Sequence, residues 1–299
     1  MTGIKVRETV ADRIFMVIVY TIVLLVTAIV LYPLIIVLSS SVSKPELVAT
    51  GQVWFLPKGL NILGYQRVLM DSAIMTGYIN TILYTVFGTA INIAVTVPAA
   101  YALAKRDLPA RRVLIFFFIF IMYFSGGMIP EFLLIQSLGL YNTRTLLFIY
   151  GAFGAYNCII CRSFFESVPA ELEEAAFIDG CSPIRAFIQI VLPISQALLG
   201  VMVLFFAVAR WNSFFVAMIY TVDADITPLQ LVLRRILIVE QTSRDMLEEA
   251  HLEDIATRVY LVELIKYAVI VVSSLPLLLL YPFLQKYFVK GVLIGSVKG

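Results

Sequence analysis

The side chains best suited to redox or metal chemistry are those of three cysteines and a single histidine. Cys158 and Cys161 form a Cys-x-x-Cys pair, which in other settings marks redox or metal chemistry. Here the pair lies inside an apolar run, and the only histidine, His251, is distant in the sequence. Because cysteine in apolar surroundings packs as a small hydrophobic residue, we predict a packing role and no metal site.

Two other kinds of chemistry lack the residues they need. A membrane-embedded enzyme requires a histidine cluster or paired intramembrane acids, and the sequence has neither. It also has no glycine-rich phosphate-binding loop that ends in Gly-Lys-Ser or Gly-Lys-Thr. We therefore expect no catalytic residue and no cofactor bound by this chain.

The most informative segment is the polar stretch 166–186. Pro169 suits the first turn of a short helix. Acidic side chains favour the positive N-terminal end of such a helix, and three follow the proline: Glu171, Glu173 and Glu174. Gly180 suits the left-handed conformation that closes a helix, and Ser182-Pro183 suits the cap and first residue of a second one. The segment therefore predicts two short helices.

One face of the first short helix combines two small side chains with one larger apolar side chain and one acidic side chain. Its members recur at helical spacing: Leu172, Ala175, Ala176 and Asp179. The two alanines would allow another surface to approach closely. A merely solvated loop is the alternative interpretation.

The rest of the chain is too apolar for a soluble domain, since 61% of its residues are hydrophobic and 14% are charged. Soluble domains carry roughly 25% charged residues. A helix that crosses the membrane needs about 20 apolar residues, and six runs approach that length. They are Ile14–Leu38, Asn80–Ala104, Val113–Ile129, Thr145–Cys161, Ile194–Tyr220 and Leu264–Leu284. We predict an all-α, polytopic membrane protein with six transmembrane helices.

The distribution of Lys and Arg predicts the orientation. Basic residues gather before the first run, after the second and fourth runs, and in the tail, with the densest cluster at 105–112. Cytoplasmic connections carry such an excess, so we expect both termini to be cytoplasmic. Residues 39–79 and 221–263 are then external, and Thr227-Pro228 predicts a helix start within the second of these loops. Arg210 interrupts the fifth run, and a charge at that depth should face a cavity or a partner.

The segment 166–186 resembles the signature of one transporter family. Inner-membrane permeases of binding-protein-dependent ATP-binding-cassette importers share E-A-A, three residues, G, nine residues and I-x-L-P. Here the pattern is Glu174-Ala175-Ala176, Gly180, Ile190 and Leu192-Pro193, with Asp179 before the glycine. Residues 124–130, 211–215 and 281–291 are similar to the carbohydrate branch, in particular the smaller maltose-type permease and permeases for complex sugars or polysaccharide fragments.

The resemblance implies a type I importer permease fold and a set of partners. These are a second homologous permease, two ATP-binding subunits, an extracytoplasmic sugar-binding protein and a sugar or oligosaccharide. The resemblance also makes the first short helix a coupling helix that docks on the ATPase through Glu174, Ala175, Ala176, Asp179 and Gly180. The tail residues Val297, Lys298 and Gly299 would reach between the ATPase subunits.

The domain organisation follows from these expectations. Residues 1–79 would hold the N-terminal tail, the first transmembrane helix and an external loop. Residues 80–285 would form a five-helix core with the coupling loop 166–186 and the external loop 221–263. Residues 286–299 would form a cytoplasmic tail. The protein would span the bacterial cytoplasmic membrane several times.

Several residues are candidates for the substrate path. Aromatic faces suit sugar rings and amides bond hydroxyl groups. The candidates are Trp211, Asn212, Phe215, Tyr123 and Asn157. Packing and bonds between helices are the alternative roles for these side chains.

We therefore predict a permease subunit of an ATP-driven sugar or oligosaccharide importer that forms half of the translocation path. An ion-coupled secondary transporter is the main alternative, and a membrane enzyme is a third. A secondary transporter usually needs ionisable groups inside the membrane, and the predicted spans hold almost none except Arg210.

Overall fold

The structure is a computed structural model that describes residues 9–248, 265–280 and 282. Every regular element in that part of the chain is helical, so the predicted all-α class is confirmed. The chain divides into two compact units, Met1–Met70 with Ile236–Ser273 and Asp71–Arg235 with Ser274–Gly299.

The first unit contains α1 (Val10–Ser41), α2 (Pro45–Ala49) and α3 (Leu63–Met70). Thr9 begins α1 with a capping box, because its hydroxyl accepts from the Asp12 amide at 3.2 Å and its amide donates to the Asp12 carboxylate at 2.8 Å. The most apolar stretch of α1 has no buried residue. A helix that is apolar all round suits a lipid environment, as predicted for the first span.

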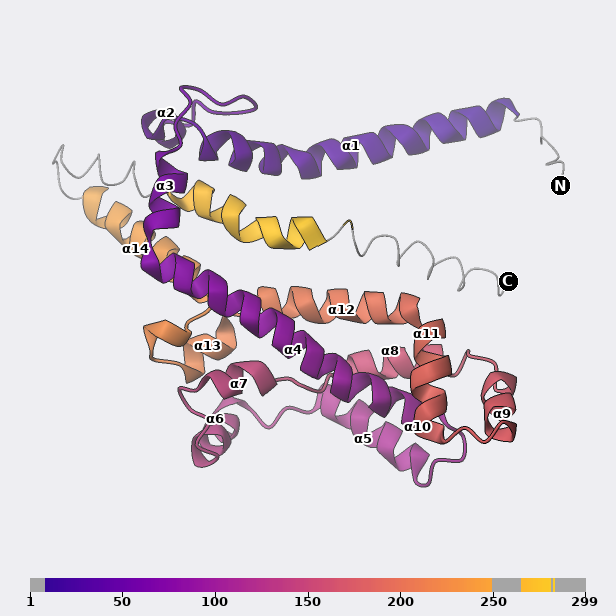
Figure 1. Cartoon of the computed structure of the whole chain (residues 1–299). Coiled ribbons are helices and arrows are strands. Elements are labelled where there is room, and N and C mark those ends of the chain that lie inside the picture. The colour runs from indigo at the N-terminus through magenta and orange to yellow at the C-terminus, as the bar shows by residue number, and fades with distance from the viewer. Residues whose placement is uncertain (1–8, 249–264, 281, 283–299) are drawn as a thin grey trace. The chain divides into compact units, whose positions relative to one another are not determined.

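The second unit is built around the long helix α4 (Ser72–Ala104), which packs against α8 (Ala155–Phe165) and α12 (Gln196–Trp211) (Figure 1). Their shared core contains Val97 and Ala100 of α4, Cys158 and Cys161 of α8, and Met202 of α12. Both cysteines are fully buried free thiols, which agrees with the predicted packing role.

Breaks divide several of the apolar runs that the sequence suggested as single spans. The third run becomes α5 (Arg111–Tyr123) and α6 (Met128–Ser137), which meet at 110°. The break lies at Gly126-Gly127, where Gly127 has a φ of +87° that L-residues disfavour. The fourth run becomes α7 (Arg144–Ile149) and α8, with Gly151 at a φ of +64° between them.

The fifth run is also divided. A chain of short helices leads into it: α9 (Glu171–Ile178), α10 (Pro183–Ala186), the π-helix η1 (Phe187–Val191) and α11 (Leu192–Ile194). The helical stretch Pro183–Ile194 meets α12 at 83°. After α12 come α13 (Phe215–Tyr220) and the 3₁₀ turn η2 (Ala224–Ile226).

The predicted helix after Thr227-Pro228 is confirmed as α14 (Leu229–Glu248), and a last helix covers Ile265–Leu280. Side chains of α4 hold the start of this region. The Asn80 amide donates to the Asp225 carbonyl at 2.8 Å, the Tyr84 hydroxyl donates to the Ile226 carbonyl at 2.8 Å, and the Thr81 hydroxyl accepts from the Leu229 amide at 2.8 Å.

Within the described residues, two helices are long and apolar enough to cross a membrane, namely α1 and α4. The total rises to four if each bent pair, α5 with α6 and Pro183–Ile194 with α12, makes one span. The total of six spans stays a prediction. The start of α4 at Ser72 lies earlier than the run from Asn80 that the sequence suggested, because Asp71 caps the helix by accepting from the Ala73 and Ile74 amides.

Candidate functional site

The segment that carries the family signature folds as the two short helices predicted for it. Gly180 follows α9 with a φ of +79°, and no atom lies within 4 Å of the position that a Cβ would take. The predicted left-handed glycine is therefore confirmed. Ser182 caps α10 by accepting from the Arg185 amide at 3.4 Å, and Pro183 is its first residue. The helix α9 itself begins at Glu171, after Pro169.

The predicted docking residues of α9 do not all face outward. Glu174, Ala175, Asp179 and Gly180 are exposed, whereas Ala176 is only 6% exposed. Ala176 therefore packs against its own chain, and Ala175 is the alanine that a partner can reach.

Apolar side chains around Gly180 add to this surface, which the sequence analysis did not recognise. Ile178 is 87% exposed and Ile184 is 73% exposed, on either side of the turn. Leu172 and Phe177 of α9 are also exposed. Clustered exposed apolar side chains commonly mark a protein contact. Polar and apolar groups together thus form a surface suited to a protein partner.

Glu173 is the functional candidate that sequence reasoning missed. Its carboxylate forms an ion pair with Lys105 and accepts a hydrogen bond of 2.8 Å from the Tyr101 hydroxyl. The Lys105 ammonium lies 4.4 Å from the Tyr101 ring centroid, and that ring packs 4.6 Å from the ring of Phe187. These contacts fasten α9 to the C-terminal end of α4. We name Tyr101, Lys105 and Glu173 the α4–α9 joint.

A second charged cluster lies at the ends of α5 and α8. Glu166 forms ion pairs with Arg111 and with Arg162, the latter at 2.8 Å. Arg111 also donates from Nε to the Leu103 carbonyl at 2.9 Å. The cluster therefore links the start of α5 with the ends of α4 and α8, next to the α4–α9 joint along the chain.

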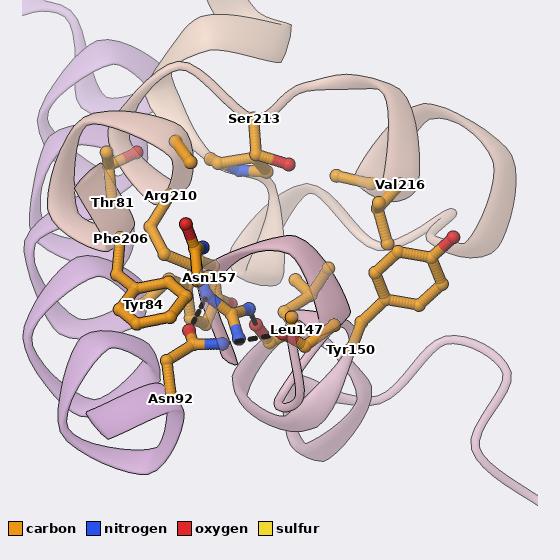
Figure 2. A pocket seen from close by; sticks show the side chains of 15 residues that line it. Thr81, Tyr84, Asn92, Leu147, Tyr150, Asn157, Phe206, Arg210, Ser213 and Val216 are labelled. Carbon is orange, nitrogen blue, oxygen red and sulfur yellow. Dashed lines mark hydrogen bonds between the residues drawn. The ribbon is translucent and has the colours of Figure 1, made fainter. Parts of the chain in front are cut away.

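A cavity of about 290 Å³ lies among α4, α7, α8, α12 and α13 (Figure 2). Its lining includes hydroxyl, amide and aromatic groups together with one guanidinium. These groups include the side chains of Asn92, Tyr150, Asn157, Arg210 and Ser213.

Arg210 borders this cavity, as expected for a charge within the fifth run, and it joins three helices. Its Nε donates to the Asn92 side-chain oxygen at 3.0 Å, and its Nη1 donates to the Leu147 carbonyl at 3.1 Å (Figure 2). The Asn92 amide in turn donates to the Gly151 carbonyl at 2.6 Å. A Cβ at Gly88 would lie 2.8 Å from Arg210 Nε, so glycine makes room for the guanidinium.

The cavity includes only one of the predicted substrate-path residues, Asn157. Trp211 is 3% exposed and packs edge-on against Tyr78 at 5.9 Å, and the Asn212 amide donates to the Val208 carbonyl of its own helix at 2.9 Å. Phe215 and Tyr123 are exposed at 53% and 87%. Their roles in a substrate path stay predictions. Val297, Lys298 and Gly299 lie outside the described residues.

Comparison with known proteins gives the family. Residues 72–294 match the family described as binding-protein-dependent transport system inner membrane component. The chain belongs to this family. The matched region starts at the first residue of α4 and includes the segment 166–186 and the cavity.

Relatives of the permease share most of its length. A Bacillus subtilis polygalacturonan/rhamnogalacturonan transport system permease, YtcP, is 37% identical over 96% of this chain and 99% of its own. The B. subtilis protein LplC is 40% identical over 92% of this chain and 91% of its own. A chain of a bacterial ABC transporter that imports the acidic polysaccharide alginate matches with a TM-score of 0.83 and 34% identity, over 95% of this permease and all of that chain.

Membership decides among the functions that the sequence left open. The permease is a transport component and not an enzyme, and it has the type I importer fold. As an inner-membrane component it works in a system that depends on a binding protein, which agrees with neither the secondary transporter nor the membrane enzyme.

Proposed function

We propose that this permease carries a saccharide across the cytoplasmic membrane as one half of a heterodimeric path. A second homologous permease would supply the other half, and an extracytoplasmic binding protein would deliver the substrate. Named relatives support a carbohydrate substrate, since they include permeases for polygalacturonan/rhamnogalacturonan and diacetylchitobiose and an alginate importer.

The observation that carries the proposal is the exposed surface of α9 and its turn. Ala175 offers close approach, Glu174 and Asp179 offer charge-assisted hydrogen bonds, and Ile178 offers apolar contact. We assign this surface to docking on one of two ATP-binding subunits. Those subunits would hold the ATP and magnesium, because the permease sequence has no phosphate-binding loop.

The α4–α9 joint gives a physical route for coupling. A movement imposed on α9 by the ATPase passes to α4 through Glu173, because the ion pair and the hydrogen bond resist separation. The same helix α4 contributes Asn92 to the cavity lining. The route therefore runs along one continuous helix from the docking surface to the cavity.

The proposal includes an orientation of the permease in the membrane. The basic residues at 105–112 support a cytoplasmic position for the α4–α9 joint and the docking surface, where ATP is available. Both termini would then be cytoplasmic, which is the side that the predicted ATPase contact of residues 297–299 requires.

A single substitution tests the docking surface. Ala175→Trp adds a bulky side chain at an exposed position, so the fold should persist while docking fails. The complex would be purified and reconstituted with its binding protein, and substrate uptake and substrate-stimulated ATP hydrolysis would be measured. Ala49→Trp, exposed in α2, is the matched control. We expect Ala175→Trp to lose uptake together with ATPase association or stimulation. Wild-type coupling in Ala175→Trp would refute the proposal.

A further inference from the structure

Arg210 places a permanent positive charge beside the cavity. A guanidinium stays protonated in proteins, so the charge cannot be removed by losing a proton. Its two acceptors, the Asn92 side-chain oxygen and the Leu147 carbonyl, are both neutral. Arg210 forms no ion pair within the described residues, and its buried Nη2 has no hydrogen-bond partner there.

Arg210 is the one charged residue among the described residues that line the cavity. Glu131 of α6 interacts with the Tyr150 hydroxyl at the lining, but it does not pair with Arg210. Charges act over longer distances in surroundings of low dielectric constant than in water. A cavity with a single sign of charge at its wall concentrates ligands of the opposite sign. This cavity should favour anions.

Polar side chains that are available for hydrogen bonding line the cavity together with Arg210. The Asn157 amide and the Ser213 hydroxyl make no side-chain hydrogen bond within the described residues, and both line the cavity. An amide and a hydroxyl can bond the ring hydroxyls of a sugar. A volume of about 290 Å³ lies at the small end of ligand pockets, which suits one sugar residue of a longer chain.

We propose that the cavity is a subsite for an acidic sugar, a residue that carries a carboxylate. Arg210 attracts the carboxylate through the electrostatic field of its charge, and Asn157 and Ser213 bond the sugar hydroxyls. The inference rests on the proposed saccharide transport and narrows its substrate to uronate-containing chains. Two relatives agree with it, since one serves polygalacturonan/rhamnogalacturonan and the other belongs to an importer of the acidic polysaccharide alginate.

The sharpest test changes the charge of the cavity without touching Arg210. Asn157→Asp is nearly isosteric and adds a negative charge to the lining, whereas Asn157→Ala removes the same amide and adds none. Neither change breaks a side-chain hydrogen bond within the described residues. Both variants would be reconstituted with the same partners as the wild type, and thermal unfolding would verify that the complexes are equally stable.

Uptake would be measured with galacturonate and mannuronate oligosaccharides and with a neutral galactose oligosaccharide. We expect uptake of an acidic oligosaccharide, and we expect Asn157→Asp to raise its KM by about tenfold or more beyond the effect of Asn157→Ala, because two negative charges would share the cavity. Equal KM values in the two variants, or uptake of the neutral oligosaccharide alone, would overturn the acidic subsite and leave saccharide transport standing. A wild-type complex that transports none of these sugars would overturn both proposals.

Discussion

Gly88 leaves the space that the Arg210 guanidinium needs, because glycine has no side chain. The Arg210 Nε lies only 2.8 Å from the position that a Cβ at residue 88 would take, and the guanidinium is held there by Asn92 and Leu147. Moving it would break the bond from Nε to Asn92. The position of Arg210 in the lining therefore depends on glycine in α4.

Gly88→Ala should destabilise the permease. The new Cβ would displace Arg210 from Asn92, and overpacking of this kind costs about 1–3 kcal/mol. The thermal unfolding midpoint of the purified complex should fall, and uptake should fall with it. Gly126→Ala is the control, because no atom lies within 4 Å of its added Cβ. Equal midpoints for the two variants would show that Arg210 shifts without cost.

Gly180 is constrained by its backbone and not by its neighbours. Gly180→Ala meets open space but must hold a φ of +79°, which costs about 1 kcal/mol for a residue with a Cβ. We expect the turn after α9 to distort and substrate-stimulated ATP hydrolysis to fall, with little change in the unfolding midpoint of the complex. Gly126→Ala again serves as control, since it lacks a positive φ. Stimulation at the wild-type level in Gly180→Ala would contradict this prediction.

At the scale of elements, the α4–α9 joint is the contact on which the proposed coupling depends. The Glu173 side chain is 11% exposed and that of Lys105 is 34% exposed, so solvent screens the pair only partly. Loss of the Lys105 ammonium leaves the largely buried Glu173 carboxylate without its ion-pair partner, which costs about 1–3 kcal/mol. The Glu173 carboxylate then keeps only the hydrogen bond that the Tyr101 hydroxyl donates to it.

A charge exchange tests the joint. Glu173→Lys and Lys105→Glu should each lower uptake per ATP hydrolysed, because α9 no longer moves with α4. The double variant restores opposite charges and should recover a measurable part of the coupling ratio. Glu171→Lys, exposed on the same helix, is the control for added charge. Failure of the double variant to improve on either single variant would contradict a direct role for the pair.

At the scale of the whole molecule, the orientation is open to direct test. Single cysteines would be introduced in a Cys181→Ser background, because Cys158 and Cys161 are fully buried and protected from reagents. We expect an impermeant thiol reagent to label Asp107→Cys and Glu174→Cys from the cytoplasmic side, and Gln52→Cys and Pro57→Cys from outside. All four positions are exposed. External labelling of Glu174→Cys would invert the proposed topology.

The sequence by itself determined the features that depend on local composition and spacing. The apolar excess indicated the membrane class. The cap residues Ser182 and Pro183 and the left-handed Gly180 indicated the two short helices around the turn at Gly180. These features could be predicted because backbone sterics and hydrogen bonding act within a few residues.

Only the tertiary structure decided which distant side chains meet. Glu173 pairs with Lys105 across 68 positions, and Arg210 reaches Asn92 across 118 positions. The tertiary structure also buried Ala176 and Trp211, which the sequence had offered to partners and substrate. The physical reason is that an amphipathic or apolar pattern determines whether a helix is buried. Which other helix it packs against depends on the packing of whole helices.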